Sequence, residues 1–288
     1  MTEVRPGVHR LEELDGPRLL CQYAVEGAER TLAVDAGLPE SPARGLLPLL
    51  SRLGCPVTLV VTHPDADHSA GAAALRAALP ELEIVAGAAD AGLVGNPERT
   101  LAERYRTFES EGIGPPPERL DAVRARLGAP FAVDRALEGD TGLDLGGRRA
   151  EVLQVPGHSP GHLAVWLPEE RIAIAGDAVM GRGIPRTDGS LLYPPMYAPP
   201  SAYRATIARL EALVPDLLLL GHEPPLAGKQ ALTFLAESRV AAERIEALVR
   251  EAGAGTLAEV CAKVAERYGV QRNDFAMTVD GILLELAA

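Results

Sequence analysis

The decisive stretch of the sequence reads Thr62-His63-Pro64-Asp65-Ala66-Asp67-His68. It follows the apolar residues 57–61 directly and places two histidines and two aspartates in one short loop. Imidazole and carboxylate groups delivered together by such a loop are typical ligands of divalent metals. The stretch therefore predicts a metal site at the end of a β-strand.

Three further segments carry histidine or aspartate next to an apolar, strand-like run. They read Gly157-His158-Ser159-Pro160-Gly161-His162, Ala175-Gly176-Asp177 and Leu220-Gly221-His222. A single histidine is usually structural, and we interpret the isolated His9 in that way. Four such loops in one chain are much harder to explain without a shared site, and we expect their strands to lie side by side so that the loops converge.

The composition is that of an ordinary globular protein. The chain has 288 residues, of which 47% are hydrophobic, and a net charge of −12. Dispersed acidic residues argue against a nucleic-acid or anionic-membrane partner. The three cysteines show no disulfide or thiolate-zinc spacing, and no apolar run reaches the roughly 18 residues of a membrane span. We expect a cytoplasmic protein that acts on a small-molecule substrate.

Strand and helix patterns alternate along the chain. Apolar and β-branched runs predict strands at residues 19–25, 31–34, 57–61, 149–155, 164–167, 172–175 and 217–220, the first two as a hairpin. Helical spacing marks residues 43–53, 69–79 and 201–213. The charged segment 97–127 is interpreted as a helical hairpin inserted over the sheet, and no strand pattern resumes before residue 149.

The last part of the chain is predicted to be almost wholly helical. We predict a catalytic domain over residues 1–230 and a helical tail over 231–288, for which a winged-helix-like form is one alternative. Thr256-Leu257-Ala258-Glu259 has the pattern of a helix cap. Because the charge of the tail is mixed rather than basic, we expect it to pack against the catalytic domain or in a homodimer, not to bind DNA.

The ligand types suggest a pair of metal ions. Two metals held about 3.5–4 Å apart typically share a hydroxide, which is a nucleophile at neutral pH. Asp67 and His68 are adjacent and are expected to face one metal, whereas His63 and Asp65 are expected to face the other. A carboxylate between the two sites, the position we expect for Asp177, would hold the pair together.

With these motifs the chain resembles the metallo-β-lactamase-fold hydrolases, whose usual first motif is H-x-H-x-D-H. The resemblance covers about residues 10–225 and implies an α+β fold, a four-layer αβ/βα sandwich. The residues that match the family's metal ligands are His63, Asp65 and His158 for the first metal, Asp67, His68 and His222 for the second, and Asp177 as the bridge. Asp35 matches an aspartate that supports the metal loop from outside, and we place His162 beside the ligands as a second supporting residue.

One position departs from the family pattern. Asp65 stands where most members have a histidine, and a carboxylate makes the first site harder and more negative. We therefore expect two divalent ions, with zinc favoured and iron or manganese as alternatives. The motif occurs in several branches of the family, so it indicates the fold more closely than the substrate.

Three functions are compatible with this site. The leading one is hydrolysis of a small carboxylic ester, lactone or thioester, with Asp67 orienting or relaying a proton. Phosphodiesterase or nuclease chemistry is an alternative, which would need a basic channel, and Arg182, Arg186 and Lys229 offer weak support for one. The third is a non-hydrolytic diiron protein that binds oxygen or acts in redox chemistry.

The loop after Asp177 supplies candidate substrate contacts. It contains an amphipathic set that would suit a small acyl group, namely Met180, Tyr193, Met196 and Tyr197. The alternative is that these side chains simply pack under the helical insertion.

Overall fold

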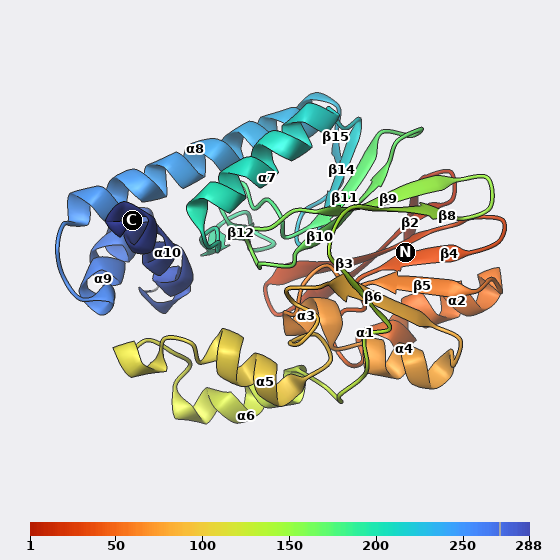
Figure 1. Ribbon diagram of the computed structural model, residues 1–288, viewed down its shortest axis with the longest axis horizontal. Helices are drawn as coiled ribbons and strands as arrows, with labels where there is room; N and C mark the ends of the chain where they lie inside the picture. Colours follow the sequence, from red (N-terminus) through yellow and green to blue (C-terminus); the bar gives the residue numbers. More distant parts are fainter. Residues whose placement is uncertain (271) are drawn as a thin grey trace.

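The computed structural model describes residues 1–270 and 272–288 of the chain. Two large β-sheets face each other, and helices cover their outer surfaces (Figure 1). The strand order is β1-β2-β3-β4-β5-β6-β7 in the first sheet and β15-β14-β11-β10-β9-β8 in the second. This arrangement is the predicted four-layer αβ/βα sandwich.

In the first sheet, β4 pairs with β5, β5 with β6 and β6 with β7, all in parallel. In the second sheet, β11 pairs in parallel with β14. The first sheet consists of β1 (Thr2–Arg5), β2 (Val8–Asp15), β3 (Arg18–Val25), β4 (Thr31–Val34), β5 (Val57–Val60), β6 (Glu83–Gly87) and β7 (Arg135–Leu137). The second consists of β8 (Thr141–Asp144), β9 (Arg149–Gln154), β10 (Leu163–Leu167), β11 (Ile172–Gly176), β14 (Leu217–Leu220) and β15 (Leu226–Ala227). A short ribbon is formed by β12 (Ile184–Pro185) and β13 (Leu191–Tyr193).

The helices fall into groups along the chain. The first sheet is accompanied by α1 (Ser41–Arg44), α2 (Leu46–Leu53), α3 (Ala66–Ser69) and α4 (Ala72–Ala78). The insertion holds α5 (Pro97–Thr100), the π-helical turn η1 (Leu101–Tyr105), the 3-10 turn η2 (Glu109–Glu111) and α6 (Pro117–Arg126). The second sheet and the tail carry α7 (Pro200–Leu213), α8 (Lys229–Ala252), α9 (Leu257–Tyr268), η3 (Arg272–Phe275) and α10 (Ala276–Ala287).

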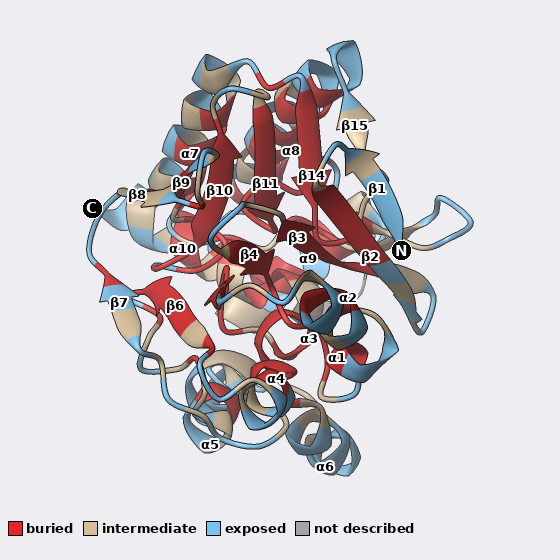
Figure 2. Cartoon of the chain, turned by 90° about the vertical axis from the view of Figure 1, so that its right-hand side faces the viewer, coloured by how far each residue is buried: buried red, intermediate tan, exposed pale blue. Residues whose placement is uncertain are grey.

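Strand β14 shows why the strand segments form continuous apolar runs. Leu217 and Leu219 belong to the core between the two sheets, whereas Leu218 and Leu220 belong to the core between the second sheet and its helices. Successive side chains of a strand point to opposite faces, and both faces are buried here (Figure 2). Burial of the two faces in two separate cores thus holds the layers together.

The four ligand-bearing loops follow strands of two different sheets, which corrects the expectation that these strands lie side by side. Their strands do not all lie side by side, because β5 belongs to the first sheet and β9, β11 and β14 to the second. The loops converge because the two sheets face each other, and the backbone N–H of Leu163 donates to the carbonyl of Thr62 at 2.9 Å across them. The site therefore lies at a shared edge of both sheets.

Several sequence-based boundaries are corrected by the structure. The helix predicted at 43–53 is interrupted at Gly45, so α1 and α2 replace it. Strands β7 and β8 lie before residue 149, where the sequence predicts none, because they are short and only partly buried. Strands β1, β2 and β6 are also missing from the prediction, whereas the hairpin of β3 and β4 is confirmed.

The helical insertion packs on the metal loop rather than over the sheet. Ala66 of that loop forms a small buried cluster with Leu101 and Leu127 of the insertion. Figure 1 shows α5 and α6 below α3, outside the helices that cover the first sheet. The insertion is thus placed to contact the predicted metal ligands directly.

The tail shares its core with the catalytic part of the chain. Side chains of α8, α9 and α10 pack in one cluster with α7 and the second sheet. The described residues of 231–288 form helices and no strand, so the wing of a winged helix is not found in them, and residue 271 lies outside the described residues. The cap at Thr256 is confirmed as a capping box with Glu259. None of the described helices is long and apolar enough to cross a membrane.

Candidate metal centre

Six of the seven predicted ligands form two buried groups. Within each group the potential ligand atoms lie within 4.8 Å of one another. The groups are His63, His158 and Asp177, and Asp67, His68 and His222. The second group has the three residues predicted for the second metal. The first group contains Asp177, predicted as the bridge, while Asp65 is in neither group.

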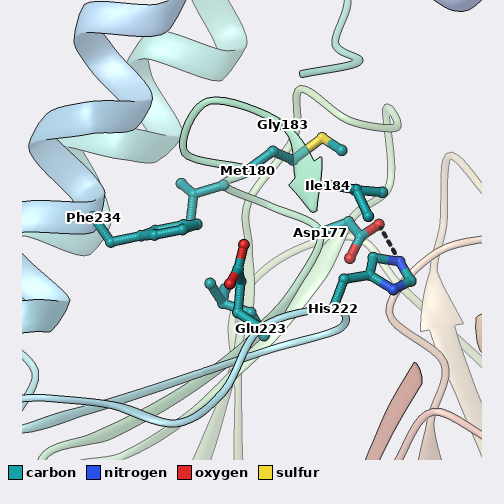
Figure 3. Close-up of a pocket in the computed structure, with 10 residues that line it drawn as sticks. Asp177, Met180, Gly183, Ile184, His222, Glu223 and Phe234 are labelled. Carbon is teal, nitrogen blue, oxygen red and sulfur yellow. Dashed lines mark ion pairs between the residues drawn. The ribbon is translucent and has the colours of Figure 1, made fainter. Parts of the chain in front are cut away.

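Asp177 belongs to the first group and also lies close to the second. Its Oδ2 is 3.2 Å from Nε2 of His222 (Figure 3). Its Oδ1 is 3.7 Å from Nε2 of His68. Gly221 permits this approach, because a Cβ there would lie 2.4 Å from Asp177 Oδ1 and 2.7 Å from His68 Cε1. The position of Asp177 is the one expected of a bridging carboxylate.

Each of the four histidines in the two groups is held through Nδ1. The partners are the Thr62 hydroxyl for His63 at 2.9 Å, Asp35 for His68 at 2.7 Å, the Met196 carbonyl for His158 at 2.8 Å and the Leu19 carbonyl for His222 at 2.8 Å. Contacts of this kind fix the orientation of a metal-binding imidazole and direct its Nε2. Within the described part of the chain, Nε2 of His63, His68 and His222 has no hydrogen-bond partner although it is buried.

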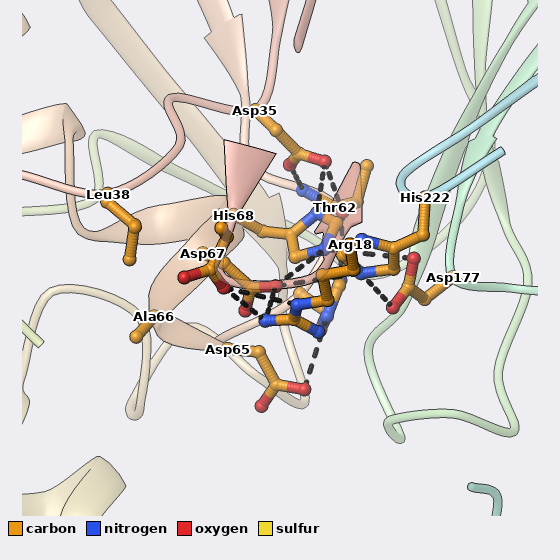
Figure 4. A network of polar contacts seen from close by, with 12 residues as sticks. Arg18, Asp35, Leu38, Thr62, Asp65, Ala66, Asp67, His68, Asp177 and His222 are labelled. Carbon is orange, nitrogen blue, oxygen red and sulfur yellow. Dashed lines mark hydrogen bonds and ion pairs between the residues drawn. The ribbon is translucent and has the colours of Figure 1, made fainter. Parts of the chain in front are cut away.

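Asp35 supports the metal loop as the sequence predicts. Besides His68 it accepts hydrogen bonds from the backbone N–H of Thr62 at 2.8 Å and from the Thr62 hydroxyl at 2.9 Å (Figure 4). Asp35 has a positive φ of 60°, an uncommon conformation for a residue with a side chain. The strained backbone turns its carboxylate towards both ends of the loop.

Two arginines that sequence reasoning missed lie at this centre. Arg104 of η1 forms a two-pronged ion pair with Asp65, with Nη2 at 2.9 Å from Oδ2. Arg18, at the start of β3, donates to Asp67 Oδ2 at 2.7 Å and to Asp15 at 2.8 Å. Neither arginine stands in a recognisable motif, because their placement depends on how the insertion and the β2–β3 hairpin pack.

Asp65 nevertheless lies close to the first group. Its Oδ2 is 3.1 Å from Nε2 of His158 and 3.4 Å from Nε2 of His63. The carboxylate thus faces both imidazoles while Arg104 holds it from the other side. Asp65 as a ligand stays a prediction.

The remaining predicted residues lie in different surroundings. The ring of His162 is fully buried and stacks on His63 with centroids 4.8 Å apart, next to the first group. Tyr193 is half-buried, and the Arg18 guanidinium lies 5.6 Å from its ring centroid. Tyr197 is fully buried and stacks on Tyr203 with centroids 4.2 Å apart, so the structure places it in the core rather than against a substrate.

A small pocket adjoins the second group (Figure 3). Asp177, His222 and Glu223 form its polar side, and apolar side chains form the rest, namely Val179, Met180, Ile184, Leu220 and Phe234. Burial raises the pKa of Glu223 to about 7, and the nearby carboxylate of Asp177 adds to this rise while His222 opposes it. Of the predicted substrate contacts, Met180 is the one found in this lining.

The carboxylates of the centre are ionised. Burial by itself would raise the pKa of Asp65, Asp67 and Asp177, but their cationic neighbours outweigh it and hold each pKa below its usual range. Arg104 is the main such neighbour of Asp65, and Arg18 is that of Asp67. Burial also lowers the pKa of His63 to about 4, whereas Asp35 and Asp177 overcome burial and raise the pKa of His68 to about 10.

The residues at this centre fit divalent metals. Buried imidazole nitrogens without a partner among the described residues point towards ionised carboxylates, and leaving such atoms unpaired would cost free energy. Nitrogen and oxygen donors without thiolate suit zinc, iron or manganese.

The comparison with protein families agrees with this geometry. The family model of the metallo-beta-lactamase superfamily matches residues 22–222. The chain belongs to this superfamily. The match begins in β3 and ends at His222, so it includes every predicted ligand.

Several named proteins are similar to this chain over part of its length. A hydroxyacylglutathione hydrolase of Erythrobacter litoralis is 35% identical over 112 residues, which are 36% of this chain and 41% of that protein. An acyl-coenzyme A thioesterase of Gallus gallus is 28% identical over 211 residues, 69% of this chain and 71% of that protein. With a probable metallo-hydrolase of Bacillus subtilis, the similar segment spans 35% of the relative's length.

Solved structures of the superfamily share the fold. A metallo-beta-lactamase family protein of Thermus thermophilus has a TM-score of 0.72 and 25% identity, and the similarity covers 99% of this chain and 94% of that one. A beta-lactamase domain protein of Burkholderia ambifaria has a TM-score of 0.73 at 21% identity, covering 99% and 89%. The likeness therefore extends over the helical insertion and the tail as well as the sandwich.

Proposed function

We propose that the chain is a metal-dependent hydrolase of small thioesters, carboxylic esters or lactones. The observation that carries the proposal is the shared orientation of four histidines, each held at Nδ1 and directed towards buried carboxylates. Such preorganised imidazoles are the usual preparation for a metal site. A site of this kind, in a superfamily that includes named hydrolases, is best explained by hydrolysis.

Two divalent ions are the proposed cofactors. The first would be held by His63, His158 and Asp177, and the second by Asp67, His68 and His222. Zinc is the proposed native metal, and the carboxylate of Asp65 beside the first group makes iron or manganese the alternative. When bound, such ions supply a strongly acidified water and polarise a carbonyl oxygen.

The chain's own residues have three tasks in this proposal. Asp35, Thr62 and the carbonyl groups behind the histidines hold the imidazoles in one orientation. Asp177, between the two groups, fixes their spacing. Asp67, an ionised member of the second group, is proposed to orient or relay a proton of the attacking water through its carboxylate oxygens.

A thioester or ester is the proposed substrate class, and the named relatives are its main support. The pocket beside Asp177 and His222 is lined mainly by apolar side chains, but at about 10 Å³ it holds little more than one water molecule, so it forms an apolar border of the site and not an acyl pocket. The named relatives include a hydrolase and a thioesterase that act on thioesters. A phosphodiester is less well matched, because Arg18 and Arg104 are each neutralised by carboxylates and the net charge is −12.

The test compares hydrolysis before and after metal removal. The full chain is stripped with a chelator, reloaded with Zn²⁺, Mn²⁺ or Fe²⁺, and assayed with a hydroxyacyl thioester, a phenyl ester, a lactone and an aryl phosphodiester. Turnover of thioester, ester or lactone that is lost on stripping and regained on reloading is the expected result. Turnover of the phosphodiester alone would favour nuclease-type chemistry. A metal-loaded protein without any hydrolysis, but with an oxygen-dependent absorption band on iron, would replace the proposal with oxygen chemistry.

A further inference from the structure

The helical insertion delivers two consecutive side chains to the metal loop. Tyr105 accepts a hydrogen bond from the backbone N–H of Ala66 at 3.1 Å, and Arg104 pairs with Asp65. Both residues lie in the π-helical turn η1, a rare local geometry that is frequently found at functional sites. The contact is therefore specific to two positions of the metal loop and does not depend on general packing alone.

Arg104 contacts the first ligand group at the atoms that a cation would use. Its Nη2 lies 2.9 Å from Asp65 Oδ2 and 2.9 Å from Nε2 of His158, and its Nη1 donates to the His158 carbonyl at 3.2 Å. The side chain is 13% exposed. The Met277 sulfur of α10 lies 4.0 Å from Nη1, so the tail also borders this guanidinium.

The hydrogen bond to His158 has a direct consequence for metal binding. Because Nδ1 of His158 faces the Met196 carbonyl at 2.8 Å, the ring proton lies on Nδ1 and Nε2 is an acceptor with one lone pair. That lone pair either accepts an N–H of Arg104 or binds a metal ion. The other three histidines of the two groups have no such competitor at Nε2 among the described residues.

The second group is not affected in the same way. Arg18 reaches it at one carboxylate oxygen, Asp67 Oδ2, and the described contacts of Arg18 include neither imidazole of that group. A guanidinium beside a ligand nitrogen also repels a cation, whereas one that shares a single carboxylate oxygen leaves the imidazoles accessible. The two groups are therefore chemically unequal.

We propose that Arg104 sets the affinity of the first metal position by competing with the cation for Asp65 and His158. Asp65, the residue that departs from the usual motif, has two states in this proposal: it is paired with Arg104, or it is released to face the metal. The insertion thus acts as a built-in determinant of how many metal ions the protein holds at a given concentration. The proposal rests on the metal centre of the proposed function but on no particular substrate.

The test is a metal titration of the stripped full-length chain with Zn²⁺, read by calorimetry and by competition with a chromophoric chelator. We expect the wild type to bind two equivalents of unequal affinity. Arg104→Met and Arg104→Gln should tighten the weaker equivalent by about ten-fold or more and leave the tighter one unchanged, a size typical of contacts that orient ligands. Arg104→Gln keeps an N–H donor for Asp65, so it provides the answer if Arg104→Met does not fold.

Arg99→Gln is the matched control, because Arg99 lies in the same insertion and pairs with Glu103 in an exposed position. It should leave both equivalents unchanged. A weaker equivalent that is unchanged or loosened in the folded Arg104 variants would overturn the competition. A wild-type chain that binds no Zn²⁺ at all would instead remove the metal centre itself, and with it both proposals.

Discussion

The carboxylate of Asp35 lies 2.7 Å from Nδ1 of His68 and also accepts both hydrogen bonds that Thr62 offers. One side chain therefore ties a histidine of the second group to the residue that precedes His63. Replacing Asp35 therefore removes hydrogen bonds that orient the ligands, while the ligand residues themselves stay unchanged.

We expect Asp35→Asn to lower the affinity for the metal by roughly 10- to 100-fold, because loss of an outer hydrogen-bond partner typically has an effect of this size. Asparagine tolerates positive φ, so the backbone at 60° is kept, while the charge is removed and one of the two accepting oxygens becomes an NH2 donor. Calorimetric Zn²⁺ titration measures the effect. The exposed Asp121, replaced in the same way, is the control, and equal affinities for the two variants would show that Asp35 does not orient His68.

Asp177→Ala tests the bridging position. Because this carboxylate lies near Nε2 of both His68 and His222, its removal should cost one equivalent of bound metal and most of the turnover. Metal content by plasma mass spectrometry, measured together with thioester hydrolysis, checks both effects.

His9→Gln is the negative control for that experiment. His9 is buried, and its Nε2 faces Glu26 Oε1 at 2.5 Å in the β2–β3 part of the sheet, so metal content should not change. Two full equivalents of metal in the Asp177→Ala protein would contradict a bridging role.

The sequence predicts which histidines and aspartates gather at one place because they lie in short local motifs, and their role as metal ligands stays a prediction. His63 and His222 each lie shortly after an apolar strand, β5 and β14, and His68 lies in α3 a few residues after His63. Both faces of these strands are buried, so their continuous apolar pattern can be recognised without knowing which strands lie beside them. Because one face of each sheet is apolar and must be buried, the two sheets pack against each other. Local patterns do not contain the pairing order of the strands, so the prediction that the strands before the four loops lie side by side is wrong.

The contact of Arg104 with the metal loop could not be predicted from the sequence. Arg104 is one of several arginines in a charged helical segment, and nothing in its immediate neighbours distinguishes it from Arg99 or Arg106. Its role depends on how Leu101 packs against Ala66, a contact between segments distant in sequence. The prediction for Tyr197 is wrong for the same reason, because an amphipathic loop pattern does not tell a pocket wall from a core position.

A third prediction concerns the free energy of unfolding at low pH. Burial would raise the pKa of Asp15, but hydrogen bonds from Arg126 and Arg18 outweigh it and lower the pKa below the ordinary 3.8. A carboxyl whose pKa is lower in the folded state stabilises the fold above its unfolded pKa, and this contribution is lost as the pH falls through the folded value. Asp15→Asn should therefore cost about 1–2 kcal/mol at pH 7 and progressively less below pH 4.

Urea unfolding of the metal-stripped proteins at pH 7 and pH 3 measures this difference. Asp121→Asn is again a suitable control, because that side chain is 97% exposed and its pairing with Arg124 should add little. A deficit of Asp15→Asn that stays constant from pH 7 to pH 3 would show that the charge of Asp15 is not its cause.

The stacked tyrosines give a matched pair of variants. Tyr197 and Tyr203 lie face to face with centroids 4.2 Å apart, but their hydroxyls differ. The Tyr203 hydroxyl accepts the backbone N–H of Met180 at 3.1 Å, whereas the buried Tyr197 hydroxyl has no partner among the described residues. Tyr203→Phe should cost about 1–3 kcal/mol because it leaves a buried N–H unpaired, and Tyr197→Phe should be neutral or slightly stabilising because it removes an unpaired polar atom. Urea unfolding compares the two, and a larger loss for Tyr197→Phe than for Tyr203→Phe would reverse this assignment of the hydroxyls.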